Sequence, residues 1–213
     1  MAAKLSMKSL AQFMTSGESR RRTILKNSKF PREAQVIIIQ YRDAINAIRD
    51  FHENGNDPAT LVKNIDRLRK KSIGATRQTE ARINNNIRAI ERYLDHFAGQ
   101  KCKIRPVPKM KYIHANVTVS VFPDLLIDED GEKTLIKLDF TQAGATDEQI
   151  EIMLQLMYEA AIAEDLGIKP KNVIYINARS EQPHRCSKIK KNLKREVDAA
   201  CENIDAMWEG IKK

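Results

Sequence analysis

The pattern of apolar and polar positions divides the chain into a helical first part and a second part in which strands and helices alternate. The apolar residues Ile83, Ile87, Ile90, Leu94 and Phe97 recur at intervals of four and three positions. This spacing places them on one face of an amphipathic helix. Shorter helices are expected before it, separated by the breakers Ser-Gly and ENGND. One of them is expected to begin at Pro31 and another at the pair Asp57-Pro58.

From residue 103 onwards the pattern changes to short runs rich in Ile and Val. The runs KIRPV, YIHANVTVSV, LLIDED and KTLIKLDF are typical of strands. A capping box formed by Thr146 and Gln149 opens a strongly apolar helix that Gly167 ends. The run NVIYINA predicts a buried strand, and residues 186–211 predict a last amphipathic helix.

The order of these elements predicts an α/β fold with a mixed four-stranded sheet flanked by helices. Three meandering strands would lead through a crossover helix to a fourth strand. We expect residues 1–72 to form a basic helical N-terminal region and residues 73–213 to form the α/β domain.

The charge of the chain is unevenly distributed along its length. The formal net charge is +9. Residues 1–108 hold 22 Lys and Arg against 10 Asp and Glu, whereas residues 109–213 hold 15 against 18. A basic half favours a polyanionic partner, above all DNA, although a solvated basic surface is the alternative. The candidate nucleic-acid contacts are clustered basic residues: Arg20, Arg21, Arg22, Lys26, Arg69, Lys70, Lys71, Lys188, Lys190 and Lys191.

Composition argues against several other classes of protein. No apolar run approaches the roughly 20 residues that span a bilayer, and the first residues lack an apolar leader, so we expect no membrane partner. The cysteines Cys102, Cys186 and Cys201 are odd in number and form no C-x-x-C pair. We therefore expect neither a disulfide framework nor a structural zinc site, and we expect a cytoplasmic location.

Candidate chemistry is concentrated in FPDLLIDEDGEKTLIKLDF, residues 122–140. Asp124 follows a proline at the start of one apolar run, and Lys137 and Asp139 lie two positions apart on the next. Residues i and i+2 of a strand share a face, so two carboxylates and an ammonium group are expected on one side of a hairpin. Such a set suits a divalent metal that acts on phosphodiesters. Two alternatives remain: Asp124 as a strand terminator, and Lys137 with Asp139 as a solvent-facing pair.

This element order, with Pro123-Asp124 and the charged i, i+2 pair, resembles the PD-(D/E)XK nuclease superfamily over roughly residues 76–213. The resemblance implies that Asp124 and Asp139 bind Mg²⁺ or Mn²⁺ and that Lys137 stabilises the transition state. It also implies a helix-borne glutamate as a further ligand, for which Glu80 is the best match and Glu91 a weaker one. Glu80 lies three positions before Ile83 on the apolar stripe, and the alternative is a solvated glutamate in the first turn, where a carboxylate favours the helix dipole. One departure stands out. The superfamily has an acidic residue two positions before the lysine, whereas here Lys137 comes two positions before Asp139.

Three functions follow from these observations. The first is a divergent, Mg²⁺-dependent nuclease that cleaves DNA. The second is a catalytically inactive nuclease-fold protein that serves as a nucleic-acid-binding or assembly subunit, which the exchanged motif favours. The third is a helical interaction protein whose basic N-terminal arm binds another protein. Gln155 and Tyr158, on the helix that follows the motif, are a weak sign of the superfamily's exonuclease branch.

Overall fold

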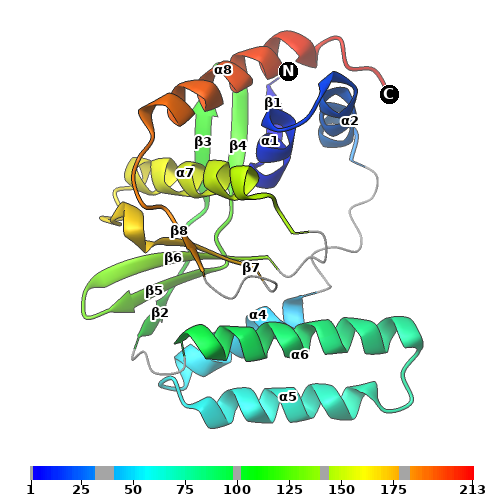
Figure 1. Ribbon diagram of the computed structural model, residues 1–213, viewed down its shortest axis with the longest axis vertical. Helices are drawn as coiled ribbons and strands as arrows, with labels where there is room; N and C mark the ends of the chain where they lie inside the picture. Colours follow the sequence, from blue (N-terminus) through cyan, green and yellow to red (C-terminus); the bar gives the residue numbers. More distant parts are fainter. Residues whose placement is uncertain (1, 32–40, 98–101, 140–143, 178–182) are drawn as a thin grey trace.

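The computed structural model describes residues 2–31, 41–97, 102–139, 144–177 and 183–213 (Figure 1). Within these ranges the chain forms a mixed α/β fold with two separate mixed sheets. The α/β class predicted from the sequence is confirmed. No helix in these ranges is long and apolar enough to cross a membrane.

The first sheet has three strands and lies at the end of the molecule that carries both chain termini (Figure 1). Its order is β1-β4-β3, with β1 parallel to β4 and β3 antiparallel to it. These strands and their neighbouring helices are β1 (Ala3–Ser6), β3 (Met110–His114), β4 (Val117–Val121), α1 (Met7–Met14), α2 (Glu18–Lys29), α7 (Asp147–Ala163) and α8 (Lys191–Trp208).

The second sheet has five strands in the order β2-β5-β6-β7-β8. Only β6 and β7 pair in parallel, and α7 makes the crossover between them. The other neighbours are antiparallel. The strands are β2 (Lys103–Arg105), β5 (Leu125–Glu129), β6 (Glu132–Asp139), β7 (Val173–Asn177) and β8 (His184–Arg185), with the 3-10 turn η1 (Pro170–Asn172) before β7.

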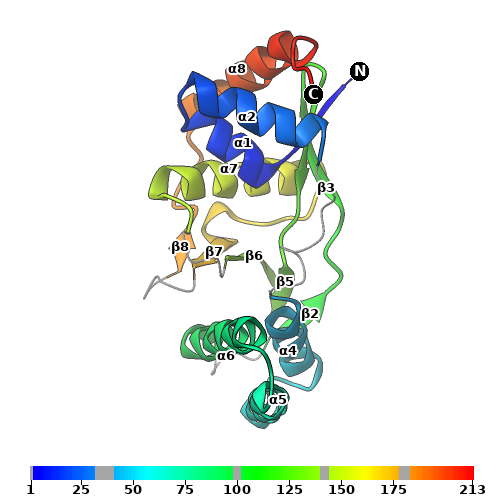
Figure 2. The same ribbon diagram turned by 90° about the vertical axis from the view of Figure 1, so that its right-hand side faces the viewer.

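Three helices form a layer on the side of this sheet away from α7 (Figures 1 and 2). They are α4 (Arg42–Glu53), α5 (Pro58–Ser72) and α6 (Arg77–Phe97). Their apolar side chains pack with one face of the five-stranded sheet, and we call this cluster the lower core. The other face packs with α7, α1, α2, α8 and the three-stranded sheet, and we call that cluster the upper core.

The N-terminal 72 residues contribute to both cores. The segment from β1 to α2 packs in the upper core, whereas α4 and α5 pack in the lower core against α6. The predicted helix that begins at Pro31 falls partly on residues 32–40, which lie outside the described residues.

Two local predictions differ from the structure. YIHANVTVSV, predicted as one strand, is the β3–β4 hairpin, in which Ala115 adopts a φ of +50°. Residues 3–6 form the strand β1, where the sequence suggested only helix. A strand of four residues carries little periodic signal, and it forms because it pairs with β4 more than a hundred positions away. The predicted single four-stranded sheet is thus two sheets.

The predicted capping box at α7 is present: the Thr146 side chain accepts from the Gln149 N–H at 3.3 Å. Thr146→Ala is expected to lower the free energy of unfolding by about 1 kcal/mol, because an N–H of the first turn loses its partner. Thr23→Ala, on the exposed face of α2, is the matched control and should change it by less than about 0.5 kcal/mol. Urea denaturation measures both, and an equal effect of the two variants would contradict the role of the cap.

Candidate functional site

Two charged residues of β6, Lys137 and Asp139, point away from the α4–α6 layer. Ile136 and Leu138 of this strand lie in the lower core, so Lys137 and Asp139 lie on the opposite face. Tyr175, the register partner of Lys137 on β7, lies on that face too, in the upper core. The structure therefore agrees with the prediction that Lys137 and Asp139 lie on the same face of a central strand.

Asp124 is held against β6 by backbone and side-chain contacts. Its Oδ2 accepts the Leu138 N–H at 2.8 Å and lies 2.9 Å from the Lys137 ammonium nitrogen. Its own N–H donates to the Ile136 carbonyl at 2.9 Å. From α4, Arg49 donates to the Asp124 carbonyl at 3.3 Å. Asp124 therefore faces Lys137 in a fixed position, with a side chain that is only 16% exposed.

Asp139 is the most deeply buried acidic group of this region, with a side chain that is 7% exposed. Its Oδ2 accepts a hydrogen bond from the Tyr175 hydroxyl at 2.5 Å and lies 3.1 Å from the Lys8 ammonium nitrogen. Burial raises the pKa of Tyr175, and the charges of Asp139 and Asp124 raise it further. The phenol therefore stays protonated and donates, and both carboxylates lie close enough to influence it.

Glu80, the third predicted ligand, is not brought to this cluster. It lies exposed in the first turn of α6, and that helix packs in the lower core, on the other side of the sheet. Glu91, the weaker match, lies on the same helix beside Arg69. Among the described residues, no group of three or more His, Cys, Asp and Glu side chains is arranged to hold a metal.

The remaining donor set can be tested for its fit to a hard divalent cation. Asp124 and Asp139 supply carboxylate oxygens, the ligands that Mg²⁺ and Mn²⁺ prefer. Each carboxylate has about four lone-pair sites, so hydrogen bonds to one oxygen do not exhaust its capacity as a ligand. The two residues fit the cation in chemical type. Against this, Lys137 and Lys8 each place an ammonium group beside one of the carboxylates, which opposes a cation there.

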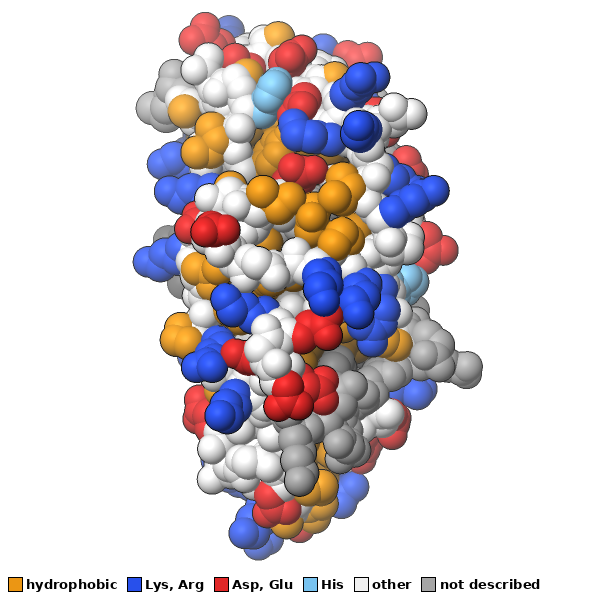
Figure 3. All heavy atoms as spheres, turned by 90° about the vertical axis from the view of Figure 1, so that its left-hand side faces the viewer, with side chains coloured by type: hydrophobic (Ala, Val, Ile, Leu, Met, Phe, Trp, Pro, Cys, Tyr) orange, Lys and Arg blue, Asp and Glu red, His pale blue; other side chains and the backbone are white. Residues whose placement is uncertain are grey.

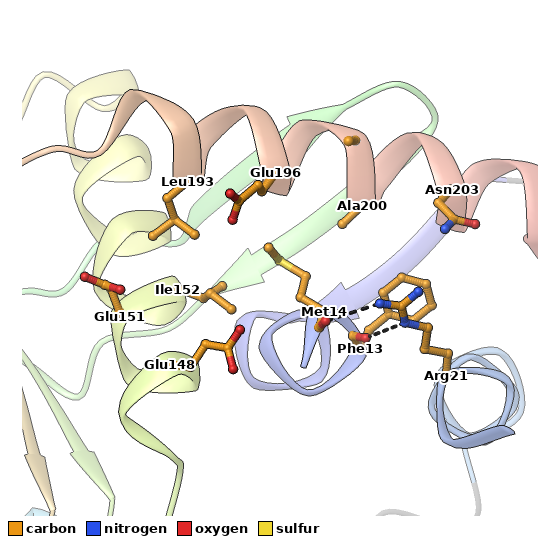
Figure 4. A pocket seen from close by; sticks show the side chains of 11 residues that line it. Phe13, Met14, Arg21, Glu148, Glu151, Ile152, Leu193, Glu196, Ala200 and Asn203 are labelled. Atoms are coloured by element: carbon orange, nitrogen blue, oxygen red, sulfur yellow. Dashed lines mark hydrogen bonds between the residues drawn. The ribbon is translucent and has the colours of Figure 1, made fainter. Parts of the chain in front are cut away.

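The predicted nucleic-acid contacts differ in the partners that they already have within the protein. Arg21 has a structural role: it donates to the carbonyls of Phe13 and Met14 at 3.0 and 3.3 Å and so fixes the end of α1 (Figure 4). Three of the predicted contacts pair with acids, and they are Arg22 with Glu18, Arg69 with Asp66 and Glu91, and Lys190 with Glu151.

The other predicted contacts make no ion pair within the described part of the chain. They are Arg20, Lys26, Lys70, Lys71, Lys188 and Lys191, and all six are exposed. The face of the molecule in Figure 3 shows Lys and Arg interspersed with Asp and Glu rather than a field of one sign. Any contact with a polyanion through this face would therefore depend on local clusters.

A pocket of about 440 Å³ lies between α1, α7 and α8 (Figure 4). Three glutamates, Glu148, Glu151 and Glu196, line it together with apolar side chains and Arg21. None of the three charged groups of the predicted metal site lines this pocket. Gln155 and Tyr158 of α7 are buried, and Gln155 donates to Glu159 at 2.7 Å. Within the described ranges, no hydrogen bond or ion pair joins either residue to Asp124, Lys137 or Asp139.

A buried Cys–His–Asn contact in the lower core resembles a nucleophilic arrangement but lacks its chemistry. The Cys102 sulfur lies 3.2 Å from His52 Nδ1, which also contacts Asn56, and His52 Nε2 contacts the Tyr93 hydroxyl at 2.6 Å. Burial raises the pKa of Cys102 to about 11 and lowers the pKa of His52. Because a thiolate is the reactive species, this group is a packed network and not a reaction centre.

Sequence reasoning missed three residues of the Asp124 cluster, namely Lys8, Arg49 and Tyr175. Tyr175 carried a weak signal, since it is the one residue with a hydroxyl in the apolar run of β7. Lys8 and Arg49 carried none, because they reach the cluster from helices that are distant in the sequence.

No protein-family model matches the chain, and no curated protein sequence matches it as a relative. The function of the site is therefore inferred from its own geometry.

The raised thiol pKa values give a prediction for reactivity and stability. The pKa values of Cys102 and Cys201 are both raised to about 11, by burial first and by nearby acidic groups second. We expect little reaction of these thiols with iodoacetamide at about pH 8, where they are protonated and enclosed. A raised folded-state pKa stabilises the fold below the unfolded value of 9.0, and this contribution is lost as the pH rises towards about 11.

Mass spectrometry of the native and denatured protein measures this labelling. Full reaction of Cys102 and Cys201 in denaturant is the internal control for reagent and time. Fast labelling of the native protein at the same pH would contradict the burial of these thiols.

Proposed function

We propose that the chain is a divergent PD-(D/E)XK-type nuclease that uses Mg²⁺ or Mn²⁺ to cleave DNA phosphodiesters. One observation carries the proposal: Asp124, Lys137 and Asp139 share one face of the five-stranded sheet, with Lys137 2.9 Å from Asp124 and Asp139 buried beside them. A charge on a central strand needs a partner or a function. We also propose a reducing, cytoplasmic location, because all three cysteines carry free thiols.

The strand order offers further support. In the five-stranded sheet, β2, β5 and β6 are successive antiparallel neighbours, and α7 then leads to the parallel strand β7. This order supports the resemblance, which implies a meander, a crossover helix and a fourth strand. The β3–β4 hairpin is inserted between the first two of these strands and builds the other sheet with β1.

Each residue of the cluster has a chemical role in this proposal. Asp124 and Asp139 would hold the cation, which when bound polarises a phosphate oxygen and lowers the pKa of a bound water. The Leu138 N–H and the Tyr175 hydroxyl orient the two carboxylates. Lys137, whose side chain is 24% exposed, would offset the charge of the phosphate.

A second candidate function is a nuclease-fold subunit that binds nucleic acid or another protein without catalysis. The specific observation in its favour is the charge balance. Two carboxylates face two ammonium groups, and Glu80 lies elsewhere, so the cluster attracts a divalent cation less than an acidic site would. If this second function is correct, the Lys137–Asp124 and Lys8–Asp139 ion pairs serve to stabilise the fold and not to bind a cation.

Cleavage of plasmid and linear DNA with Mg²⁺ or Mn²⁺ separates the two functions. Asp124→Asn and Asp139→Asn are each expected to lower the cleavage rate by about a hundredfold or more, because each removes a ligand charge. Asp128→Asn is the matched control, since Asp128 lies on β5 but pairs with Arg105 at 3.0 Å. DNA retention without cleavage by any variant would favour the binding subunit. Undiminished cleavage by Asp124→Asn would remove the proposed site.

The salt dependence of DNA binding tests the exposed basic residues. The double variants Arg20→Gln/Lys26→Gln and Lys70→Gln/Lys71→Gln are expected to weaken binding and to reduce the slope of log K against log salt by about one for each phosphate that the variant no longer neutralises. Arg105→Gln is the control and should leave the slope unchanged, because Arg105 is not among the predicted contacts and pairs with Asp128 at 3.0 Å. A slope that matches the wild-type value in both double variants would exclude these four residues from the interface.

A further inference from the structure

Lys8 reaches the Asp124–Lys137–Asp139 cluster from the far end of the sequence. The strand β1 pairs with β4 and runs directly into α1, whose first turn is fixed by the Ser6 side chain, which accepts from the Ser9 N–H at 3.0 Å. Lys8 belongs to this first turn, and its ammonium nitrogen lies 3.1 Å from Asp139 Oδ2. A strand and a helix cap together therefore place one cation at one buried carboxylate.

The two partners of this ion pair differ in their access to solvent. The Asp139 side chain is 7% exposed, whereas the Lys8 side chain is 41% exposed. A buried carboxylate needs a compensating charge, and the Tyr175 hydroxyl supplies only a neutral hydrogen bond to the same oxygen. Lys8 supplies a compensating charge to this carboxylate, and its ammonium group is still accessible to an anion in solvent.

Lys8 also determines the charge that a cation would meet. With Lys8 in place, each of the two carboxylates has an ammonium group beside it. Without the Lys8 charge, a cation at Asp139 would meet one positive charge fewer. An ammonium group a few ångströms from a divalent cation opposes its binding, since the screening of such a short, partly buried pair is weak.

We propose that Lys8 is an internal counter-ion that occupies Asp139 until a phosphate of the nucleic acid draws the ammonium group away. The divalent cation and the nucleic acid would then bind cooperatively, because the phosphate relieves the repulsion that the cation meets. By linkage, the cation strengthens nucleic-acid binding by the same factor. This inference rests on the proposed function, since it concerns the same two carboxylates.

Mn²⁺ binding, measured from the electron paramagnetic resonance signal of the free ion, tests the inference without relying on cleavage. Lys8→Gln is expected to bind Mn²⁺ at least about tenfold more tightly than the wild type. Lys4→Gln makes the same charge change on an exposed residue of β1 and should match the wild type. Lys8→Arg keeps the charge and should match it as well. Adding Asp139→Asn to Lys8→Gln should abolish the gain.

A short duplex DNA with phosphorothioate linkages then tests the coupling. It is expected to raise the Mn²⁺ affinity of the wild type at least about fivefold and that of Lys8→Gln by less than about twofold. Thermal unfolding of Lys8→Gln and Lys4→Gln checks that both variants remain folded. Equal Mn²⁺ affinity in these two variants, or no Mn²⁺ binding by any variant, would overturn the inference.

The same experiments separate the inference from the proposed nuclease. Tighter Mn²⁺ binding by Lys8→Gln, with no DNA cleavage by any variant, would support the counter-ion and reject the nuclease. Cleavage by the wild type, with unchanged Mn²⁺ affinity in Lys8→Gln, would support the nuclease and reject the counter-ion.

Discussion

The coverage of β6 on both faces is the constraint on which the candidate site depends. Ile136 and Leu138 are buried against the helical layer, and Leu135 is buried against the upper core. Charged groups on such a strand lose most of their hydration and must be compensated within the protein. The pairing of Lys137 with Asp124, and of Asp139 with Lys8 and Tyr175, is the observed compensation.

The same constraint explains why the cluster draws on elements from the whole chain. β5 brings Asp124 to β6 through the antiparallel pairing of the hairpin, and β7 brings Tyr175 through the parallel pairing made by α7. Lys8 comes from α1, which packs against α7 in the upper core. The cluster thus joins side chains from β6, β7 and α1, which lie far apart in the sequence.

Much of the fold was predictable because its signals are local. The helix α7 begins at the predicted capping box, and α5 begins with Asp57 as N-cap and Pro58 in the first turn, as such pairs indicate. The strands β5, β6 and β7 follow the predicted apolar runs. The strand β1 could not be recognised, since four residues show too little alternation and their partner β4 is remote.

The candidate site was also predictable in part. The i, i+2 spacing placed Lys137 and Asp139 on one face, and the hairpin placed Asp124 beside them. Glu80 is not the ligand that the resemblance implies, and the alternative of a solvated glutamate in the first turn of α6 is the one that the structure has. Lys8 escaped prediction because its role depends on the packing of α1, a tertiary contact without a local pattern.

The parallel pairing of β1 with β4 has a consequence for the order in which the chain is synthesised. The first strand leaves the ribosome long before residues 117–120, its partners in the sheet, and it has nothing to pair with until they emerge. Lys8 must wait longer still, because Asp139 lies beyond them in the sequence. Residues 3–8 therefore reach their final place only after residue 139 has been synthesised.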